Sequence, residues 1–219
     1  MRNLICLAWL LFFFGGMRVC AQDAVNGRIL SHYVFDSFQK GKVFFKSGSM
    51  QEVSLNYNTL TAEMVFDDGG KYLAMGEPEK VDSVVISGRV FIPVEMKFYE
   101  LLGRGASPLF VEYTSTIKEE GNNLGYGMTS TTAAATTLKS LIQGGGAYNL
   151  KLPEGFEVIS KHEYWILFGG RYRPANNTRQ VSTIFPSKKE FVSRWVKEHH
   201  TDFSSNDGMV ALAQAIDKN

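Results

Sequence analysis

Alternating hydrophobic and polar positions between residues 28 and 102 predict antiparallel β-structure. Three pairs of strand-like segments are each separated by a glycine-containing turn. They are residues 42–46 and 50–57, residues 61–66 and 71–75, and residues 81–86 and 89–94. Short strands joined by such turns are typical of consecutive β-hairpins. Because no helical pattern separates the strands, we expect a meander and not a doubly wound parallel sheet.

The faces of these strands differ in polarity. In the strand over residues 50–57, Val53, Leu55 and Tyr57 share one face, while the polar side chains, Asn56 among them, share the other. This pattern predicts one solvent-exposed face. Residues 81–94 are apolar on both faces, so we expect another sheet or a helix to cover their second face.

The middle of the chain changes in composition after residue 103. Residues 109–117 predict one more strand, and residues 121–146 form a stretch rich in Gly, Thr and Ala that predicts a long flexible insertion. Residues 156–159 and 163–168 then predict two strands that end at a Gly–Gly pair.

The last part of the chain predicts two short amphipathic helices. Phe191, Val192, Trp195 and Val196 fall on one helical face, and apolar residues between 209 and 216 keep the same spacing. Start signals precede both segments: Ser187 with Glu190, and Ser204 with Asp207. Helices of this length are unstable alone, so we expect them to dock on the sheet.

These patterns define an α+β protein. We expect an antiparallel β-domain over residues 22–105, a strand-rich segment with the flexible insertion over residues 106–186, and a C-terminal helix pair over residues 187–219.

The first 21 residues predict a cleaved signal peptide. A short basic start is followed by eleven apolar residues, 4–14, and then by Val19, Cys20 and Ala21 before Gln22. The apolar run is shorter than the roughly 20 residues that a membrane-spanning helix needs. A lipoprotein interpretation would instead use Cys20 as the cleavage site, but Arg18 stands where small apolar residues are required.

Removal of the leader changes the composition of the mature chain. Both cysteines, Cys6 and Cys20, are lost, which excludes disulfides, a thiolate nucleophile and cysteine-ligated zinc. Two of the 23 basic residues, Arg2 and Arg18, are lost as well, which leaves 21 basic against 22 acidic residues. This balance argues against nucleic acid as the main partner. We expect no transmembrane span in the mature chain.

Three groups of residues hold side chains of the types used in catalysis or metal binding. His199 and His200 are adjacent, whereas metal-binding helices place their ligands four residues apart. His162 and Glu163 are neighbours on a strand and point to opposite faces. Residues 67–70 lack the alternating acidic ligands of a calcium loop and fit a β-turn. We therefore expect no catalytic residue, no metal site and no cofactor.

One cluster suggests a binding surface. Trp165 and Tyr172 lie close in sequence to Arg171 and Arg173, and aromatic rings beside arginines suit glycan stacking or the recognition of anions. The alternative is a strand whose Trp165 packs inward, followed by solvated arginines in a loop.

Several stretches resemble uncharacterised secreted proteins that are common in Bacteroidetes envelopes. They are residues 38–48, 55–58 and 81–86, together with Phe91, and the tail at residues 184–191. The resemblance implies an exported protein in the periplasm or on the surface of a Gram-negative bacterium. It implies no activity.

The expected function is that of a non-enzymatic, envelope-associated binding or structural module, whose partner is an unknown envelope protein or glycan. The alternative is a hydrolase that acts on envelope or extracellular polymers through a carboxylate pair, because the distances among 22 acidic residues are not visible in a sequence.

Overall fold

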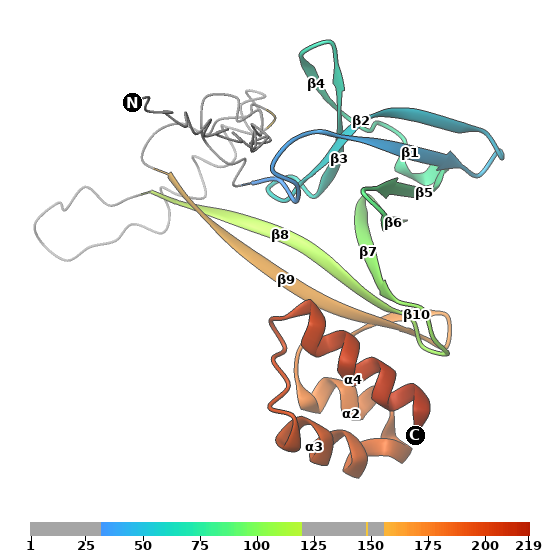
Figure 1. The fold of residues 1–219 in the computed structure, drawn as a ribbon, viewed down its shortest axis with the longest axis vertical. Helices are drawn as coiled ribbons and strands as arrows, with labels where there is room; N and C mark the ends of the chain where they lie inside the picture. The colour runs from blue at the N-terminus through green and yellow to red at the C-terminus, as the bar shows by residue number, and fades with distance from the viewer. Residues whose placement is uncertain (1–31, 120–147, 149–155) are drawn as a thin grey trace, which may run out of the picture.

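The computed structural model describes residues 32–119, residue 148 and residues 156–219, and the predicted leader and insertion lie outside this part. Ten strands of the described residues form one antiparallel sheet in the order β10-β9-β8-β7-β6-β5-β1-β2-β3-β4 (Figure 1). The prediction of a sheet-rich α+β fold is confirmed. The strands are β1 (Gln39–Phe45), β2 (Met50–Asn58), β3 (Glu63–Asp68), β4 (Lys71–Ala74), β5 (Val81–Ile86), β6 (Arg89–Val94), β7 (Lys97–Gly103), β8 (Leu109–Glu119), β9 (Phe156–Phe168) and β10 (Arg171–Pro174).

The three predicted hairpins are present as β1–β2, β3–β4 and β5–β6. Strand β1 departs from the sequential order of the sheet, because it pairs with β2 on one edge and with β5 on the other. Gly41 lies in β1 at this crowded place. A Cβ atom there would lie 2.9 Å from the carbonyl oxygen of Val85 and 3.0 Å from Leu55 Cδ1. Glycine therefore allows β1 to fit between its two neighbours.

The sheet curls back on itself. Strands β8 and β2 are separated by four other strands in the sheet order. Even so, Ser115 N in β8 donates a hydrogen bond of 2.8 Å to Thr59 O, directly after β2. Figure 1 shows β1 to β6 wrapped above the long β8–β9 ribbon. On residues 81–94 the face with Val84, Ile86 and Phe91 is fully buried, whereas Val85, Val90, Ile92 and Val94 on the other face are only half-buried, so the expected cover of the second face is incomplete.

The prediction of a solvent-exposed face on β2 is wrong at Asn56, which is fully buried. The side chain of Asn56 accepts a hydrogen bond from Phe35 N (3.1 Å) and donates one to Phe35 O (2.8 Å). The segment before β1 therefore covers this part of β2, and the buried amide is satisfied by its backbone.

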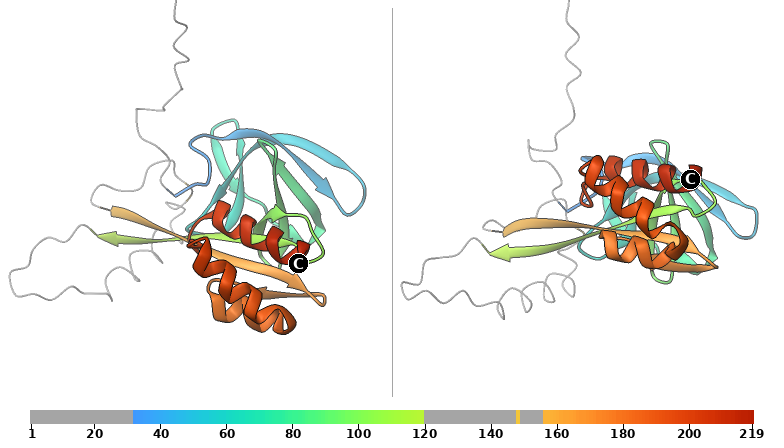
Figure 2. Two further views of the ribbon diagram at one scale, coloured as in Figure 1. Left: turned by 60° about the horizontal axis from the view of Figure 1, so that its bottom comes forward. Right: turned by 90° about the horizontal axis from the view of Figure 1, so that it is seen from below.

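Three helices follow the sheet: α2 (Thr178–Ile184), α3 (Lys189–Glu198) and α4 (Asn206–Lys218). Figure 2 shows them grouped beside the β8–β9 ribbon. The two predicted helices are α3 and α4, whereas α2 was not predicted. Its N-cap is Asn177, whose side chain accepts a hydrogen bond from Gln180 N. None of the helices in the described residues has both the length and the hydropathy needed to cross a bilayer.

Both predicted helix starts are displaced. A 3-10 turn, Pro186–Lys188, precedes α3, and no side chain caps that helix, so Ser187 is not its cap. Helix α4 is capped by Ser205, whose side chain accepts from Gly208 N, and not by Ser204. Start signals locate a helix more reliably than they locate its first residue.

The strands before α2 also differ from the prediction. The two segments predicted at residues 156–159 and 163–168 form one strand of 13 residues, β9. The residues after Gly170 form β10 and not a loop. Because residues 156–166 of β9 pair with β8 without a break, the polar residues in the middle of β9 do not interrupt it.

The core lies on the inner face of the curled sheet and continues beneath the helices. Its largest fully buried side chains include Tyr57, Phe91, Phe98 and Tyr164 from the sheet and Met209 and Leu212 from α4. On α3 only Val192 is fully buried, and the partly buried Phe191 and Trp195 rings pack on each other at 6.0 Å. One continuous core therefore joins the sheet to α4.

Candidate functional site

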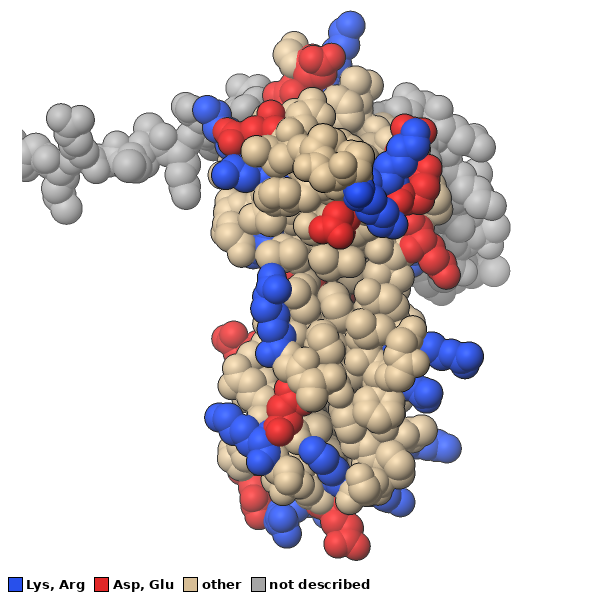
Figure 3. All heavy atoms as spheres, turned by 90° about the vertical axis from the view of Figure 1, so that its right-hand side faces the viewer, with Lys and Arg blue, Asp and Glu red and all other residues tan. Residues whose placement is uncertain are grey.

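A polar hollow of about 330 Å³ opens on the inner face of the sheet, between its curled part and the helices. We call it the waist hollow, since the molecule narrows between its strand-rich and helical ends (Figure 3). Its volume is at the lower end of the roughly 300–1,000 Å³ found for small-molecule sites. The lining residues come from six separate parts of the chain: Tyr33, Val34, Thr59, Arg89, Tyr113, Thr114, Ser160, His162 and Asn206.

An ion pair between the lining residue Arg89 and the buried Glu100 borders the waist hollow. Arg89 Nε and Nη2 donate hydrogen bonds to the two carboxylate oxygens of Glu100, at 2.7 and 2.6 Å. Glu100 is 5% exposed. Such a two-pronged pair is the strongest geometry between arginine and a carboxylate. The positive charge of Arg89 is therefore neutralised inside the protein.

The Arg89 guanidinium also lies against aromatic rings. Its central carbon is 4.8 Å from the centre of the Phe35 ring, 5.6 Å from that of Phe91 and 5.4 Å from that of Tyr113. Burial lowers the pKa of Arg89, but the hydrogen bonds and charge of Glu100 outweigh it, so the pKa is raised overall. Arg89 is thus held charged and immobile.

The Tyr113 hydroxyl connects the ion pair to helix α4. It donates to Glu100 at 2.5 Å and accepts from Arg89 Nη2 and from Asn206 Nδ2, both at 3.0 Å. Asn206 Oδ1 in turn accepts from the Tyr164 hydroxyl at 2.9 Å. Burial, with the nearby Glu100 charge, raises the pKa of Tyr113. Burial likewise raises the pKa of Tyr164 to about 12.

Hydroxyl groups and an imidazole also lie at the waist hollow. Thr59 and Ser115 hydroxyls lie 2.7 Å apart, and Ser115 Oγ donates a longer bond of 3.4 Å to Ser160 Oγ. The His162 ring stands edge-on to Tyr113 with ring centres 4.9 Å apart. Ser160 and His162 are both exposed. These two side chains are accessible to a ligand from solvent.

The waist hollow suits the binding of a neutral polar molecule. Arg89 lines the hollow, and its protein partners among the described residues bind Nε and Nη2, which leaves Nη1 as a further donor. Hydroxyl, amide and imidazole groups supply further donors and acceptors, and the rings of Tyr33 and Tyr113 supply apolar surface. Because the ion pair carries no net charge, an anion gains little there.

The four residues predicted from sequence as a binding surface do not lie together. The strand register places Phe110, Trp165 and Pro174 side by side, and Tyr172 opposite Leu167 on the same face. Arg171 and Arg173 pair with Phe168 and Ile166 and point to the other face.

The two aromatic side chains belong to a ring cluster. Trp165 stacks on Tyr99 with ring centres 5.7 Å apart, and Tyr172 meets Tyr99 and Phe110 edge-on at 5.6 and 5.2 Å. Tyr99 and Phe110 are buried, and Trp165 and Tyr172 are half-buried. This cluster packs one face of the sheet, apart from the two arginines.

His162 and His199 both contact aromatic rings. His162 contacts Tyr113 on one face of β9, whereas its neighbours Lys161 and Glu163 form an ion pair on the other. His199 stacks on Trp195 with ring centres 3.6 Å apart. Within the described ranges, no three His, Asp or Glu side chains gather closely enough to hold a metal ion.

Residues 67–70 form the expected turn, since Gly70 N donates to Asp67 Oδ1 at 2.6 Å.

One pair of carboxylates lies side by side, as Glu112 in β8 is directly opposite Glu163 in β9. Each forms an ion pair with its own lysine, Glu112 with the Lys97 side chain and Glu163 with Lys161. Glu112 is 2% exposed. A glycosidase needs one carboxyl group that is protonated and reaches its substrate; this pair, neutralised by lysines, does not offer that arrangement.

Comparison with known proteins gives no family model, no curated protein and no solved structure that matches this chain.

Proposed function

We propose that the protein is an exported, non-enzymatic binding module of the envelope of a Gram-negative bacterium, and that it binds a neutral saccharide in the waist hollow. The leader-like first 21 residues and the resemblance to Bacteroidetes envelope proteins support the export. The observation that carries the binding role is the composition of the hollow. It combines aromatic surface with hydroxyl, amide and imidazole groups around an arginine that Glu100 already neutralises.

A sugar matches this composition better than an anion or an apolar ligand does. Its hydroxyl groups can both donate to Ser160 and His162 and accept from Arg89 Nη1, while its C–H faces can lie on aromatic rings. The volume of about 330 Å³ is that of a small ligand. We expect one sugar unit, free or at the end of a polymer, to occupy it.

The binding test is a nuclear magnetic resonance titration of the mature protein with glucose, galactose and N-acetylglucosamine. A neutral sugar should shift the signals of residues in the waist hollow in a saturable manner. Ser160→Trp should abolish the shifts, because Ser160 is exposed at the hollow and the indole would fill it. The matched control is Ile159→Trp, since Ile159 is 47% exposed on the opposite face of the same strand. Equal binding by both variants would exclude this hollow as the site.

The export is tested by intact-mass analysis of the protein from native cells. Cleavage after Ala21 should leave Gln22, or its cyclised form, as the first residue. A lipid attached to Cys20 would contradict this and would make the protein a lipoprotein.

A further inference from the structure

The helical end of the molecule concentrates positive charge. Residues 169–219, which hold β10 and the three helices, contain eight lysines and arginines and five acidic residues, a net charge of +3. The chain as a whole carries 23 basic and 22 acidic residues. Figure 3 shows a row of basic side chains along one edge of the helical end. This end therefore has a positive potential that the rest of the chain balances.

A second hollow, of about 400 Å³, lies between β10 and α2 within this basic region. Arg173 from β10 and Arg179 from α2 both line it, and both are exposed. Its other lining residues are Pro174, Asn177, Gln180, Thr183 and Ile184, so no acidic side chain faces the two guanidinium groups across it. We call it the arginine hollow.

Both arginines are available to a ligand. The four ion pairs among the described residues involve Lys80, Arg89, Lys97 and Lys161, and neither arginine of the hollow. Arg89 differs from both arginines, because the charge of Glu100 neutralises it.

Gln180 adds a further donor. Its Oε1 atom accepts a hydrogen bond of 2.7 Å from Asn176 N. The side-chain group that Gln180 can offer to the hollow is therefore its amide NH₂. Two guanidinium groups and one amide make a set of donors, which calls for a ligand that supplies only acceptors.

We propose that the arginine hollow binds a phosphate group. A phosphate offers several acceptor oxygens in the geometry that guanidinium groups recognise with two parallel hydrogen bonds. The hollow is open to solvent beside the exposed Thr183 and Arg179, so a phosphate that is attached to a larger molecule can enter it. The phosphate of a lipid headgroup and a soluble phosphate share this chemistry. This site is separate from the waist hollow and does not depend on the saccharide proposal.

The test uses inorganic phosphate as one probe and vesicles as the other. The mature protein is titrated with phosphate while the arginine and Gln180 side-chain signals are followed by nuclear magnetic resonance. Vesicles of phosphatidylglycerol and phosphatidylcholine, with pure phosphatidylcholine as a blank, are tested by co-sedimentation. We expect saturable binding in at least one arm, weakened by added salt. The phosphate arm reports a soluble ligand, and binding only to the anionic vesicles reports a lipid headgroup.

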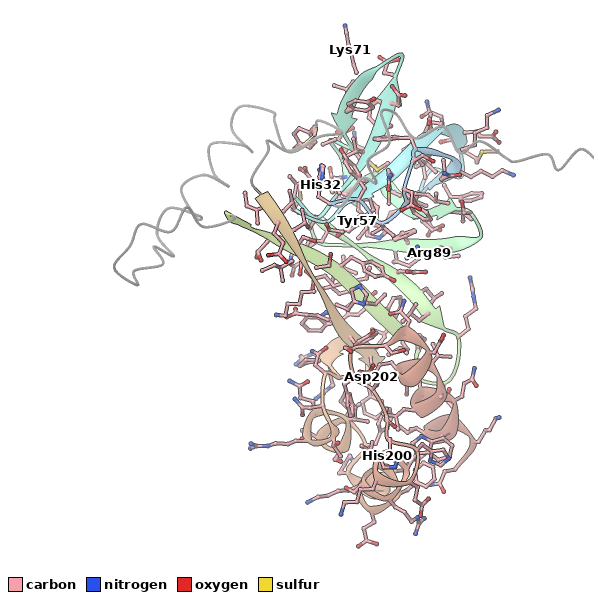
Figure 4. All side chains as sticks on the ribbon, turned by 60° about the vertical axis from the view of Figure 1, so that its left-hand side comes forward. His32, Tyr57, Lys71, Arg89, His200 and Asp202 are labelled. Carbon is pink, nitrogen blue, oxygen red and sulfur yellow. The ribbon has the colours of Figure 1, made fainter. Side chains whose placement is uncertain are left out.

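Three variants make the test specific. Arg173→Gln with Arg179→Gln should weaken binding by about tenfold or more for each arginine removed, as expected for charge-assisted hydrogen bonds. Arg171→Gln removes an exposed charge from the same strand but outside the hollow, and Lys71→Gln removes one at the far end of the sheet (Figure 4). Both should bind as the native protein does. Absence of binding in both arms, or an equal loss in either control, would overturn the proposal. Unchanged circular dichroism will show that the exposed substitutions leave the fold intact.

Discussion

Tyr113 is the residue at which the sheet, the buried ion pair and helix α4 meet. Its hydroxyl contacts Glu100, Arg89 and Asn206 at once. Buried polar networks of this kind stabilise a fold only when every member is satisfied. The three partners of the Tyr113 hydroxyl are all protein side chains. Its removal should therefore affect the stability of the fold more than the binding of a ligand in the waist hollow.

Tyr113→Phe should lower the free energy of unfolding at neutral pH by about 1–3 kcal/mol, because Glu100 loses a donor and Arg89 and Asn206 lose an acceptor. The pH dependence has a definite sign. Burial raises the pKa of Tyr113 above its usual value of 10.0, so the unfolded chain loses this proton first as the pH rises. The contribution of the Tyr113 proton to the free energy of unfolding is complete below pH 10. Above pH 10 it decreases, at up to about 1.4 kcal/mol per pH unit.

Urea unfolding at pH 7 and at steps above pH 10 measures both effects. The native protein should lose stability more steeply with pH than Tyr113→Phe does. Other buried tyrosines contribute to both proteins equally, so the difference in slope isolates Tyr113. Identical slopes of stability against pH would mean that folding does not raise the pKa of Tyr113.

At the scale of elements, β1 decides how the sheet closes. It lies between β5 and β2, and the hairpin β3–β4 is thereby placed at the edge of the sheet. Gly41 is the residue that this position requires, because a Cβ atom would meet Val85 O, Leu55 Cδ1 and Ile86 Cγ1 at 2.9–3.1 Å. Two of these neighbours are packed side chains from strands on opposite edges of β1.

Gly41→Ala should destabilise the protein by about 1–3 kcal/mol, the usual cost of inserting a methyl group into a closely packed site. The matched control is Gly76→Ala, since a Cβ atom at Gly76 meets nothing within 4 Å. That variant should change stability by less than about 0.5 kcal/mol. Thermal unfolding of the two variants, followed by circular dichroism, gives the comparison. Equal stabilities would show that β1 is not held as tightly between its neighbours as the fold requires.

The hairpins were predictable because their signals are local. Alternating side chains define each strand, and glycines at positive φ, such as Gly48 and Gly88, define the turns. The place of β1 and the burial of Asn56 were not predictable, since both depend on segments distant in sequence, Val85 for one and Phe35 for the other. Helix α2 was not predictable from the sequence, because its seven residues contain only one short apolar repeat after the N-cap Asn177.

The candidate sites show the same difference between local sequence signals and contacts of distant segments. Residues 171–174 form a strand, and the period of two in a strand separates Tyr172 from Arg171 and Arg173. The waist hollow had no such signal. Its residues come from six parts of the chain, and the pairing of Arg89 with Glu100, which decides what the hollow can bind, joins residues 11 positions apart on neighbouring strands.

At the scale of the whole molecule, the strand-rich and helical ends are joined by buried contacts. The strands of residues 39–103 and those of residues 109–174 form one sheet, although the sequence suggested a boundary near residue 105. Helix α4 packs Met209 and Leu212 into the same core, and Asn206 bonds the hydroxyls of Tyr113 and Tyr164. Neither end can separate without exposing apolar surface and breaking this network.

The protein should therefore unfold in one cooperative step. Without the predicted leader, which contains Trp9, the tryptophans are Trp165 in β9, stacked on Tyr99, and Trp195 in α3, so the fluorescence of a Trp165→Phe variant is used to report the helical end. Far-ultraviolet circular dichroism near the β-sheet minimum reports mainly the strands. In urea the two signals should give the same midpoint and the same dependence on denaturant, as a two-state transition requires. Asn206→Ala should lower both midpoints together. A fluorescence transition that precedes the loss of the sheet signal would mean that the helices unfold as a separate unit, and the waist hollow would then lie between two independent domains.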